Sequence, residues 1–395
     1  MDRTGNPKPD AGDSRPATGD FALIPDPELP PGIASTAALA DLAAAFHRGF
    51  RHYTPTPVRR LDQLARELGV ASLLLKDEAS RFGLNAFKGL GASFAMHHWC
   101  ATHDVAGDAV FTTATDGNHG RAVAWMARLL GCRAVIFMPT HSVPARIAAI
   151  QNEGAKVVLV AEGYDAAVRR ALEAADTHRW IVIQDTATAG YTAVPEWIGA
   201  GYWTMARELE STIHAAGRPD VDVVLLHAGV GTWPAAMVQY YWHRYGDRRP
   251  RLVVVEPTES ACVLESVQAG HATPATGSLR TIMAGLNCGF PSTTAFEILR
   301  RSVDALIAIP DVWAERAMIR LAALDPPVIS GESGAASVAG LMALMTDPTY
   351  RPVREHIQLG PESRVLVWST EGATDPVGWE RIVGRPLPQQ PSVRR

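Results

Sequence analysis

The chain has 395 residues, of which 47% are hydrophobic, and it carries a formal net charge of −4. Such a chain can bury one large core or two domain cores, and its small negative charge gives no reason to expect nucleic acid or an anionic membrane as a partner. No uninterrupted apolar run approaches the ~20 residues of a membrane-spanning helix. The N-terminal segment lacks the basic-then-apolar order of a signal peptide, so we expect a cytoplasmic protein.

Both ends of the chain have the composition of disordered segments. Residues 1–20 are rich in Asp, Pro and Gly, and residues 385–395 contain several prolines and glutamines. Such segments cannot bury enough apolar surface to offset the conformational entropy that is lost on folding. We therefore predict a disordered tail at 1–20 and a flexible one at 385–395.

Between the tails, apolar runs of buried-strand type alternate with segments of helical periodicity. The runs predict strands at residues 72–76, 109–115, 133–139, 155–161, 180–185, 221–226, 251–256 and 364–369. The periodic segments predict helices at 89–100, 120–130, 143–151, 166–175, 195–216, 233–245, 312–323 and 334–345. This alternation indicates an α/β fold with parallel sheets covered by helices on both faces. One sheet of this size would be unusual, so we expect two domains with a binding site in the cleft between them.

Lys88 stands in Asn85-Ala86-Phe87-Lys88-Gly89, at the start of the helix predicted for 89–100. A lysine that enters a helix from an aromatic neighbour is poorly placed for a surface salt bridge. It is well placed for a Schiff base, which needs an amine that is desolvated enough to lose its proton near neutral pH. The alternative is a solvated lysine at a helix start.

A glycine-rich turn follows the strand predicted for 221–226 and opens the next helix, with the sequence His227-Ala228-Gly229-Val230-Gly231-Thr232. A strand, a glycine turn and a helix N-terminus together bind phosphate through backbone N–H groups. Most Gly-x-Gly turns bind nothing. Combined with a reactive lysine, however, this turn indicates pyridoxal phosphate (PLP).

Several longer segments resemble one enzyme family. They are Lys76-Asp77-Glu78, residues 81–88, Thr115-Asp116-Gly117-Asn118-His119-Gly120, Gln184-Asp185-Thr186, Gly190-Tyr191-Thr192, residues 282–289 and residues 330–335. Together they resemble 2,3-diaminopropionate ammonia-lyase, a branch of the fold-type II PLP enzymes, whose relatives include threonine dehydratase and tryptophan synthase β. The resemblance implies a large domain from residues 21–93 and 204–384, a smaller inserted α/β domain at 94–203, PLP between them, and a homodimer.

The same resemblance assigns residues to the cofactor. Lys88 would form the Schiff base with PLP, and Asn118 would bind the 3′-oxygen. The phosphate would be held by Gly229, Val230, Gly231 and Thr232. Thr370 would meet the pyridine nitrogen, with Ser369 almost equally suited because one residue of register separates them. Phe87 would pack on the ring unless it is a core aromatic, and Glu332 would line the pocket floor unless it only opens the following helix.

A second set of residues would bind the substrate. The resemblance places its carboxylate on Thr115 and on the backbone of Gly117, Asn118 and His119; capping of the next helix is the alternative for Thr115 and Asn118. Asp116 would be a base opposite Lys88, or else a helix cap. Asp185 would be a second carboxylate near the substrate ammonium, or else a solvated loop residue. His119 has no partner at ligand spacing, so we expect no metal site.

The predicted reaction is elimination of ammonia from 2,3-diaminopropionate, giving pyruvate and two ammonia in all. A serine- or threonine-type dehydratase, a β-replacement synthase and a non-catalytic binding subunit are the alternatives. The chain departs from the family at Ala187-Thr188-Ala189, where a bulky aromatic and an acidic residue are usual, and we expect this to open the pocket. Cys262 and Cys288 match a family cysteine pair; we expect reduced thiols, with a disulfide left open.

Overall fold

The computed structural model describes residues 20–388 except 106, 162 and 211–219. The tails predicted at 1–20 and 385–395 therefore lie largely outside the described residues. Residues 385–388, the first four of the predicted C-terminal tail, belong to the described part. The Arg385 side chain donates a hydrogen bond to the carbonyl of Ala322, and the Leu387 N–H donates to the Glu380 carboxylate at 2.9 Å. This segment is thus held against the body of the protein.

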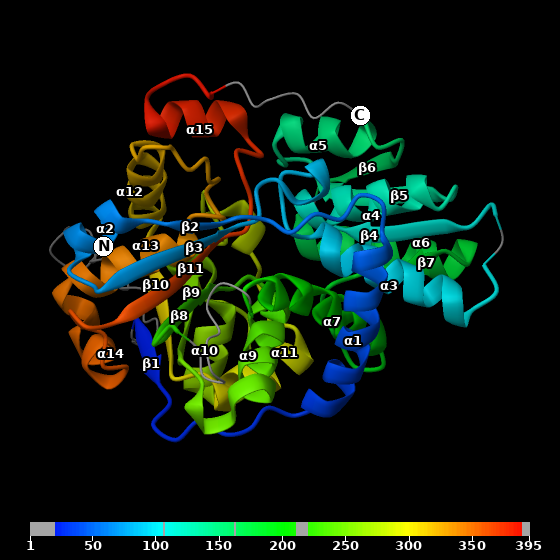
Figure 1. The fold of residues 1–395 in the computed structure, drawn as a ribbon. Coiled ribbons are helices and arrows are strands. Elements are labelled where there is room, and N and C mark those ends of the chain that lie inside the picture. The colour runs from blue at the N-terminus through cyan, green and yellow to red at the C-terminus, as the bar shows by residue number, and fades with distance from the viewer. Residues whose placement is uncertain (1–19, 106, 162, 211–219, 389–395) are drawn as a thin grey trace, which may run out of the picture.

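Two separate sheets organise the fold (Figure 1). The larger has the order β1-β10-β9-β8-β11-β3-β2, and its two edge strands, β1 and β2, run antiparallel to their neighbours. Its strands are β1 (Phe21–Leu23), β2 (Val58–Arg60), β3 (Ser72–Asp77), β8 (Val223–His227), β9 (Arg251–Pro257), β10 (Ala305–Ile309) and β11 (Arg364–Ser369). The smaller sheet, β6-β5-β4-β7, is wholly parallel and contains β4 (Val110–Ala114), β5 (Arg133–Pro139), β6 (Lys156–Val160) and β7 (Ile181–Val182).

Helices cover both faces of the larger sheet, which explains why its strands read as continuous apolar runs. Along β9, Leu252 and Val254 face one core while Val253 and Val255 face another, as the two-residue period of a strand requires. The first core is closed by α9 (Thr232–Tyr245), α10 (Cys262–Ala269) and α11 (Thr293–Ser302). The second is closed by α2 (Asp62–Leu68), α12 (Asp311–Ala322), α13 (Ala336–Thr346), α14 (Arg351–His356) and α15 (Pro376–Val383).

The smaller sheet is enclosed in the same way. Its one face packs on α4 (Asn118–Leu129) and α5 (Pro144–Gln151), and its other face packs on α6 (Tyr164–His178). The face under α4 belongs to the same hydrophobic core as one face of the larger sheet. The two sheets are thus joined through a continuous apolar interior.

Three further helices make that connection: α1 (Ile33–Gly49), α3 (Gly89–Thr102) and α7 (Ala193–Glu208). Helices α3 and α7 cross very closely, because a Cβ atom at Gly201 would stand 2.7 Å from the carbonyl oxygen of Leu90. The expected domain boundaries at residues 94 and 203 fall inside these two helices. All four strands of the smaller sheet lie between those boundaries, and we retain the division as a proposal.

A buried ionic cluster anchors the segment that leads into α3. The Glu208 carboxylate on α7 accepts from Lys76 Nζ at 2.6 Å and from Arg81 Nη2 at 2.8 Å, and Arg81 Nε also donates to Glu78 at 2.8 Å. All four side chains are almost fully buried, so their charges compensate one another where water cannot. The cluster fixes the start of the loop that carries Lys88.

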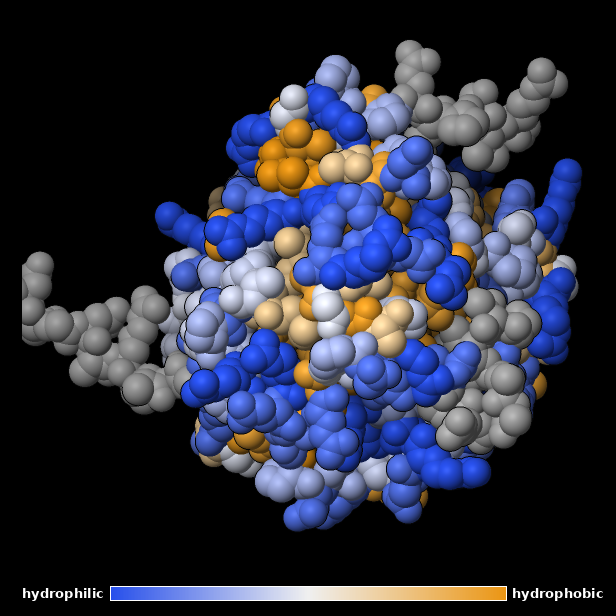
Figure 2. All heavy atoms as spheres, turned by 60° about the vertical axis from the view of Figure 1, so that its left-hand side comes forward, coloured by the Kyte–Doolittle hydropathy of each residue, from blue (hydrophilic) through white to orange (hydrophobic). Residues whose placement is uncertain are grey.

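The described helices, which leave out 211–219, include none long and apolar enough to cross a membrane. The face in Figure 2 shows apolar residues in small patches among hydrophilic ones. Of the helix predicted for 195–216, α7 covers the part up to Glu208, and residues 211–216 lie outside the described residues. The strand predicted for 180–185 is confined to Ile181–Val182. The predicted helix at 334–345 begins only at Ala336.

Candidate functional site

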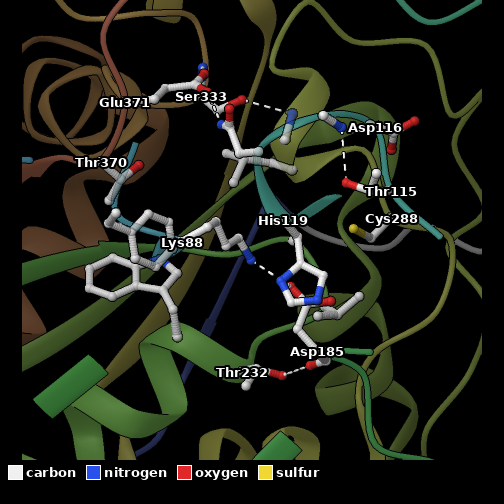
Figure 3. A pocket seen from close by; sticks show the side chains of 18 of the residues that line it. Lys88, Thr115, Asp116, His119, Asp185, Thr232, Cys288, Ser333, Thr370 and Glu371 are labelled. Carbon is white, nitrogen blue, oxygen red and sulfur yellow. Dashed lines mark hydrogen bonds and ion pairs between the residues drawn. The ribbon is translucent and has the colours of Figure 1, made fainter. Parts of the chain in front are cut away.

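Lys88 lies at the N-terminus of α3, in a cavity between the two sheets (Figure 3). Its Nζ atom donates a hydrogen bond to Asp185 Oδ2 at 2.6 Å and lies near the rings of Phe87 and Tyr202. Burial by itself lowers the pKa of Lys88, but the adjacent Asp185 carboxylate outweighs it and raises that pKa above its usual value. The expectation that burial deprotonates Lys88 near neutral pH is therefore wrong for this state.

Asp185 follows β7 and is buried. Burial raises the pKa of Asp185, but the positive charge and the hydrogen bond of Lys88 act in the opposite direction, and the pKa falls to about 2. Asp185 is thus an ionised carboxylate and not a solvated loop residue. Its main-chain carbonyl also accepts a hydrogen bond from Thr232 Oγ1 at 2.5 Å.

The turn between β4 and α4 brings Thr115, Asp116, Asn118 and His119 to the same cavity. Thr115 Oγ1 accepts from the N–H groups of Gly117 at 2.9 Å and Gly120 at 3.2 Å, so it caps the start of α4. Since the Gly117 N–H is used in this way, its expected role as a carboxylate donor does not fit the structure. Gly117 has φ of 154°, a conformation that favours glycine.

Asn118 is held by an acidic side chain that was not predicted for the site. Its Nδ2 atom donates to Glu371 Oε2, and the other carboxylate oxygen of Glu371 accepts from the Ser333 N–H at 3.2 Å. Figure 3 shows Glu371 and Ser333 together at one side of the pocket. The Asn118 amide is thereby fixed at the pocket wall with a second N–H available.

Asp116 is partly buried in the same turn. Burial raises its pKa to about 7, against the opposing effect of the positive charge of Arg146. A carboxyl group with this pKa changes its protonation near neutral pH, which suits a general acid or base. Asp116 and Lys88 lie on different sides of the pocket (Figure 3).

His119 packs between these groups. Its Nε2 atom donates to the carbonyl of Ile183 at 2.7 Å, which leaves Nδ1 facing Asp185 Oδ2 at 3.9 Å. Burial lowers the pKa of His119, so the ring is neutral. Within the described part of the chain, no group of three or more His, Cys, Asp or Glu side chains is arranged to hold a metal ion.

The glycine turn lies between β8 and α9, and Gly229, Val230, Gly231 and Thr232 all line the cavity. Gly231 precedes α9 in the left-handed conformation, with φ of 94°. A Cβ atom at Gly229 would stand 2.9 Å from Cys288 Sγ, so the loop is closely packed without a side chain there. The unpaired N–H groups of the first helical turn are suited to an anion.

The end of β11 settles which hydroxyl enters the pocket. Thr370 lines the cavity and shares a 2.7 Å hydrogen bond with His227 Nε2, whereas Ser369 is turned away and donates to Ser330 at 2.8 Å. The geometry therefore favours Thr370 as the partner of a ring nitrogen.

Two expected cofactor contacts look different in the structure. Phe87 borders the cavity but packs edge-on against Trp233, with ring centroids 5.6 Å apart, as a core aromatic does. Glu332 lies behind the cavity wall, with Oε2 3.9 Å from Arg146 Nη2, and does not belong to the lining residues. Glu371, which was not predicted for the site, is the glutamate that lines the described cavity.

Besides Glu371, the lining contains polar residues to which the sequence reasoning gave no role in the site, among them Arg146, Tyr164, His227 and Ser333. Ser333 and His227 lie next to predicted site residues in the sequence, and this adjacency could have identified them as lining residues. Arg146 and Tyr164 come from α5 and α6, where nothing in the local pattern distinguishes them from surface residues.

The departure at Ala187-Thr188-Ala189 does not open the pocket. Ala187 is buried and its N–H donates to Ser292 Oγ at 2.9 Å, while Thr188 and Ala189 are exposed and none of the three lines the cavity. Cys262 and Cys288 are free thiols. Cys288 borders the cavity, and Cys262 lies beneath it, donating to the carbonyl of Gly229 at 3.6 Å.

The arrangement fits pyridoxal phosphate. A lysine amine, a glycine turn at a helix N-terminus and the hydroxyl of Thr370 all border one cavity. The amine would take the aldehyde, the turn the phosphate, and Thr370 the pyridine nitrogen. Asn118 lines the same cavity and would meet the ring oxygen.

Comparisons with known proteins agree with this fit. Residues 50–367 match the family model described as pyridoxal-phosphate dependent enzyme. The diaminopropionate ammonia-lyase of Salmonella typhimurium is 38% identical over 364 residues, which are 86% of this chain and 90% of that protein. The Escherichia coli K12 enzyme of the same name is 39% identical over 362 residues, covering 87% and 91%.

Solved structures lead to the same group. The Escherichia coli diaminopropionate ammonia-lyase in complex with an aminoacrylate–PLP azomethine reaction intermediate superposes with a TM-score of 0.85 at 37% identity, over 92% of this chain and 96% of that one. Threonine deaminase isoform 2 of Solanum lycopersicum, at 18% identity and a TM-score of 0.74 over 93% and 97%, shares the fold. The chain therefore belongs to the pyridoxal-phosphate-dependent enzymes of fold-type II and, among them, to the diaminopropionate ammonia-lyase family.

Proposed function

We propose that this pocket eliminates ammonia from C3 of 2,3-diaminopropionate, and that hydrolysis of the product releases pyruvate and a second ammonia. The observation that carries the proposal is the placement of two ionisable groups, Lys88 and Asp116, on different sides of one cavity. A substrate with two amino groups supplies the positive charge that a pocket containing Asp116, Asp185 and Glu371 requires.

Bound pyridoxal phosphate supplies an electron sink for the negative charge that develops at Cα. Lys88 accepts or returns the proton on its side of Cα, and Asp116 accepts it from the other side. As the Cα–H bond breaks, the bond from Cβ to the second nitrogen breaks and ammonia leaves. Use of both sides is what allows both the D- and the L-isomer to react.

Asp185 has two successive roles in this proposal. Before the cofactor is bound it neutralises Lys88 across 2.6 Å. When the lysine nitrogen is committed to the cofactor, the carboxylate is released and faces the substrate ammonium. His119 is neutral and its ring is fixed by the hydrogen bond to the Ile183 carbonyl, so it packs beside Asp185 without adding a charge.

The substrate carboxylate binds at the start of α4, on Thr115 and on the N–H groups of Asn118 and His119. The partial positive charge of the helix N-terminus favours an anion there. Thr115 keeps its hydroxyl proton for the substrate, because its oxygen is the acceptor for the two backbone N–H groups.

We also propose a cytoplasmic homodimer whose partner is a small amino acid. The support is the match to the family over most of the chain. Size-exclusion chromatography with light scattering tests the dimer.

The experiment that tests the function is pyruvate release from D- and L-diaminopropionate, serine and threonine, with PLP added in excess. Preferred turnover of diaminopropionate supports the proposal. A dehydratase is the second candidate, because an Escherichia coli diaminopropionate ammonia-lyase has been solved in complex with D-serine. Faster pyruvate release from serine than from diaminopropionate would establish that candidate instead.

A further inference from the structure

Arg146 is the charged residue of the pocket to which the proposed reaction gives no role. Of the lining residues that the structure describes, Lys88 and Arg146 can carry a positive charge, and Asp116, Asp185 and Glu371 can carry a negative one. Lys88 is paired with Asp185. Among the described lining residues, the guanidinium of Arg146 is thus the cation that can balance a negative charge on Asp116.

The position of Arg146 is determined by close packing. Its side chain rises from α5 and is only 6% exposed. The stem lies directly under the turn that carries Asp116, since a Cβ atom at Gly117 would stand 2.8 Å from Arg146 Cδ. Any residue but glycine at 117 would displace it.

The polar contacts of the guanidinium are weak for a buried arginine. Its Nη2 atom donates to the neutral hydroxyl of Thr374 at 3.2 Å and lies 3.9 Å from Glu332 Oε2. Its Nε atom is buried and has no hydrogen-bond partner among the described residues. Because so few direct polar contacts balance the positive charge of this buried arginine, that charge can stabilise a negative group in the pocket.

The groups around Asp116 come from every side of the cavity. They are Lys88 with its partner Asp185, His119 on α4, Tyr164 on α6, Cys288 before α11, and Glu371 after β11. Burial raises the pKa values of Tyr164 and Cys288, and the nearby Asp116 carboxylate raises them further, so both are neutral. Arg146 is the cation that favours the ionised form of Asp116.

We propose that Arg146 is a positioning residue: held by Thr374 beneath the Gly117 turn, its guanidinium favours the carboxylate form of Asp116, which can accept the substrate proton. This inference rests on the proposed function of Asp116 as a base. It explains why a buried arginine lies under the turn of Asp116, a carboxyl group whose pKa is raised by burial.

The direct test is the titration of Asp116 itself, in protein labelled with ¹³C at the aspartate carboxyl and with the signal assigned by its loss in Asp116→Asn. In Arg146→Gln, we expect Asp116 to titrate about 1–3 pH units higher than in the unmodified enzyme. Arg146→Lys, which keeps the charge, should restore most of the difference. An unchanged titration in Arg146→Gln would overturn the proposal.

Kinetics with the PLP-loaded enzyme provide the second readout. For D-diaminopropionate, the acidic limb of kcat/KM against pH should move upward in Arg146→Gln, and for the L-isomer it should stay in place. Arg128→Gln, which removes an exposed partner of Glu153 from α4, is the matched control and should move neither limb. An equal rise in KM for both isomers with no shift of either limb would show that Arg146 binds the substrate carboxylate instead.

Two further results keep the test decisive. If Arg146→Gln does not fold, Thr374→Val removes the anchor and leaves the charge, and it should shift the Asp116 titration in the same direction by less. No shift in that variant would count against the proposal. If the enzyme does not turn over diaminopropionate at all, the proposed function fails, while the titration still decides the role of Arg146.

Discussion

Lys88 Nζ and Asp185 Oδ2 lie 2.6 Å apart, although 97 residues separate them in the chain. This contact holds the lysine as an ammonium, because the carboxylate raises its pKa. The same Asp185 accepts from Thr232 through its main-chain carbonyl. One residue thus links the amine that meets the cofactor aldehyde to the turn that meets its phosphate.

Asp185→Asn should change how the cofactor is taken up. Only the neutral amine attacks an aldehyde, and removing the carboxylate lowers the pKa of Lys88. The rate of appearance of the visible chromophore on mixing apoenzyme with PLP should therefore rise at neutral pH, and its pH dependence should move to lower pH. Stopped-flow absorbance measures both. Asp176→Asn, at an exposed position on α6, is the control, and identical profiles for the two variants would contradict the assignment.

Lys88→Ala should lose the visible, borohydride-reducible chromophore and nearly all activity. The variant also leaves Asp185 buried without its cation. Lys88→Arg separates the two effects, because arginine keeps the ion pair but forms no Schiff base. We expect Lys88→Arg to be folded, colourless and inactive; a reducible chromophore in either variant would remove Lys88 from its role.

Asp116→Asn should distinguish the two isomers of the substrate. The amide preserves size and polarity but accepts no proton. Turnover of D-diaminopropionate should fall by roughly 10²–10⁴-fold, the usual contribution of a general base, while turnover of the L-isomer falls much less. Steady-state pyruvate release with each isomer measures the difference, and cofactor absorbance serves as the control. Equal losses would indicate substrate binding and not proton transfer.

Thr232→Val should weaken cofactor binding. The substitution removes a hydroxyl at the phosphate turn and its hydrogen bond to the Asp185 carbonyl. A hydrogen bond to a charged group contributes about 1.5–3 kcal/mol, so the dissociation constant of PLP should rise roughly tenfold or more. Thr232→Ser retains the hydroxyl and should bind normally in a fluorescence titration. Gly231 is a poorer probe, because its φ of 94° means that any side chain there also strains the backbone.

Glu208→Gln should destabilise the fold and leave the site chemistry in place. Lys76 and Arg81 would keep their buried charges without the carboxylate that both contact, at a cost of about 3–5 kcal/mol in the free energy of unfolding. Urea unfolding followed by circular dichroism measures it. Asp41→Asn breaks the exposed pair with Arg207, where Asp41 is 75% exposed, and should cost less than about 1 kcal/mol. Similar midpoints for the two variants would refute the role of the buried cluster.

Local patterns in the sequence were enough for much of the fold and part of the site. Strands β5 and β11 have the bounds that their apolar runs predict, because buried parallel strands differ from helices in length and period. Helix α1 was missed, since its alanine-rich sequence has little amphipathic contrast, and β1 and β2 were missed because each is only three residues long. The lysine at a helix start and the glycine turn after β8 could be recognised as parts of a cofactor site from the residues next to them in the sequence.

The tertiary structure decided every question that depended on a distant partner. Thr370 and not Ser369 enters the cavity because successive side chains near the end of β11 point to opposite faces, and only the packed sheet shows which face holds the site. Glu371 holds Asn118, and Asp185 keeps Lys88 charged; in each case the partner comes from another part of the chain. Arg146 gives no local signal at all, since its burial and its charge matter only where α5 packs under the Gly117 turn. Sequence alone determines such chemistry only where the interacting groups are neighbours in the chain; elsewhere the electrostatics depend on the folded distances.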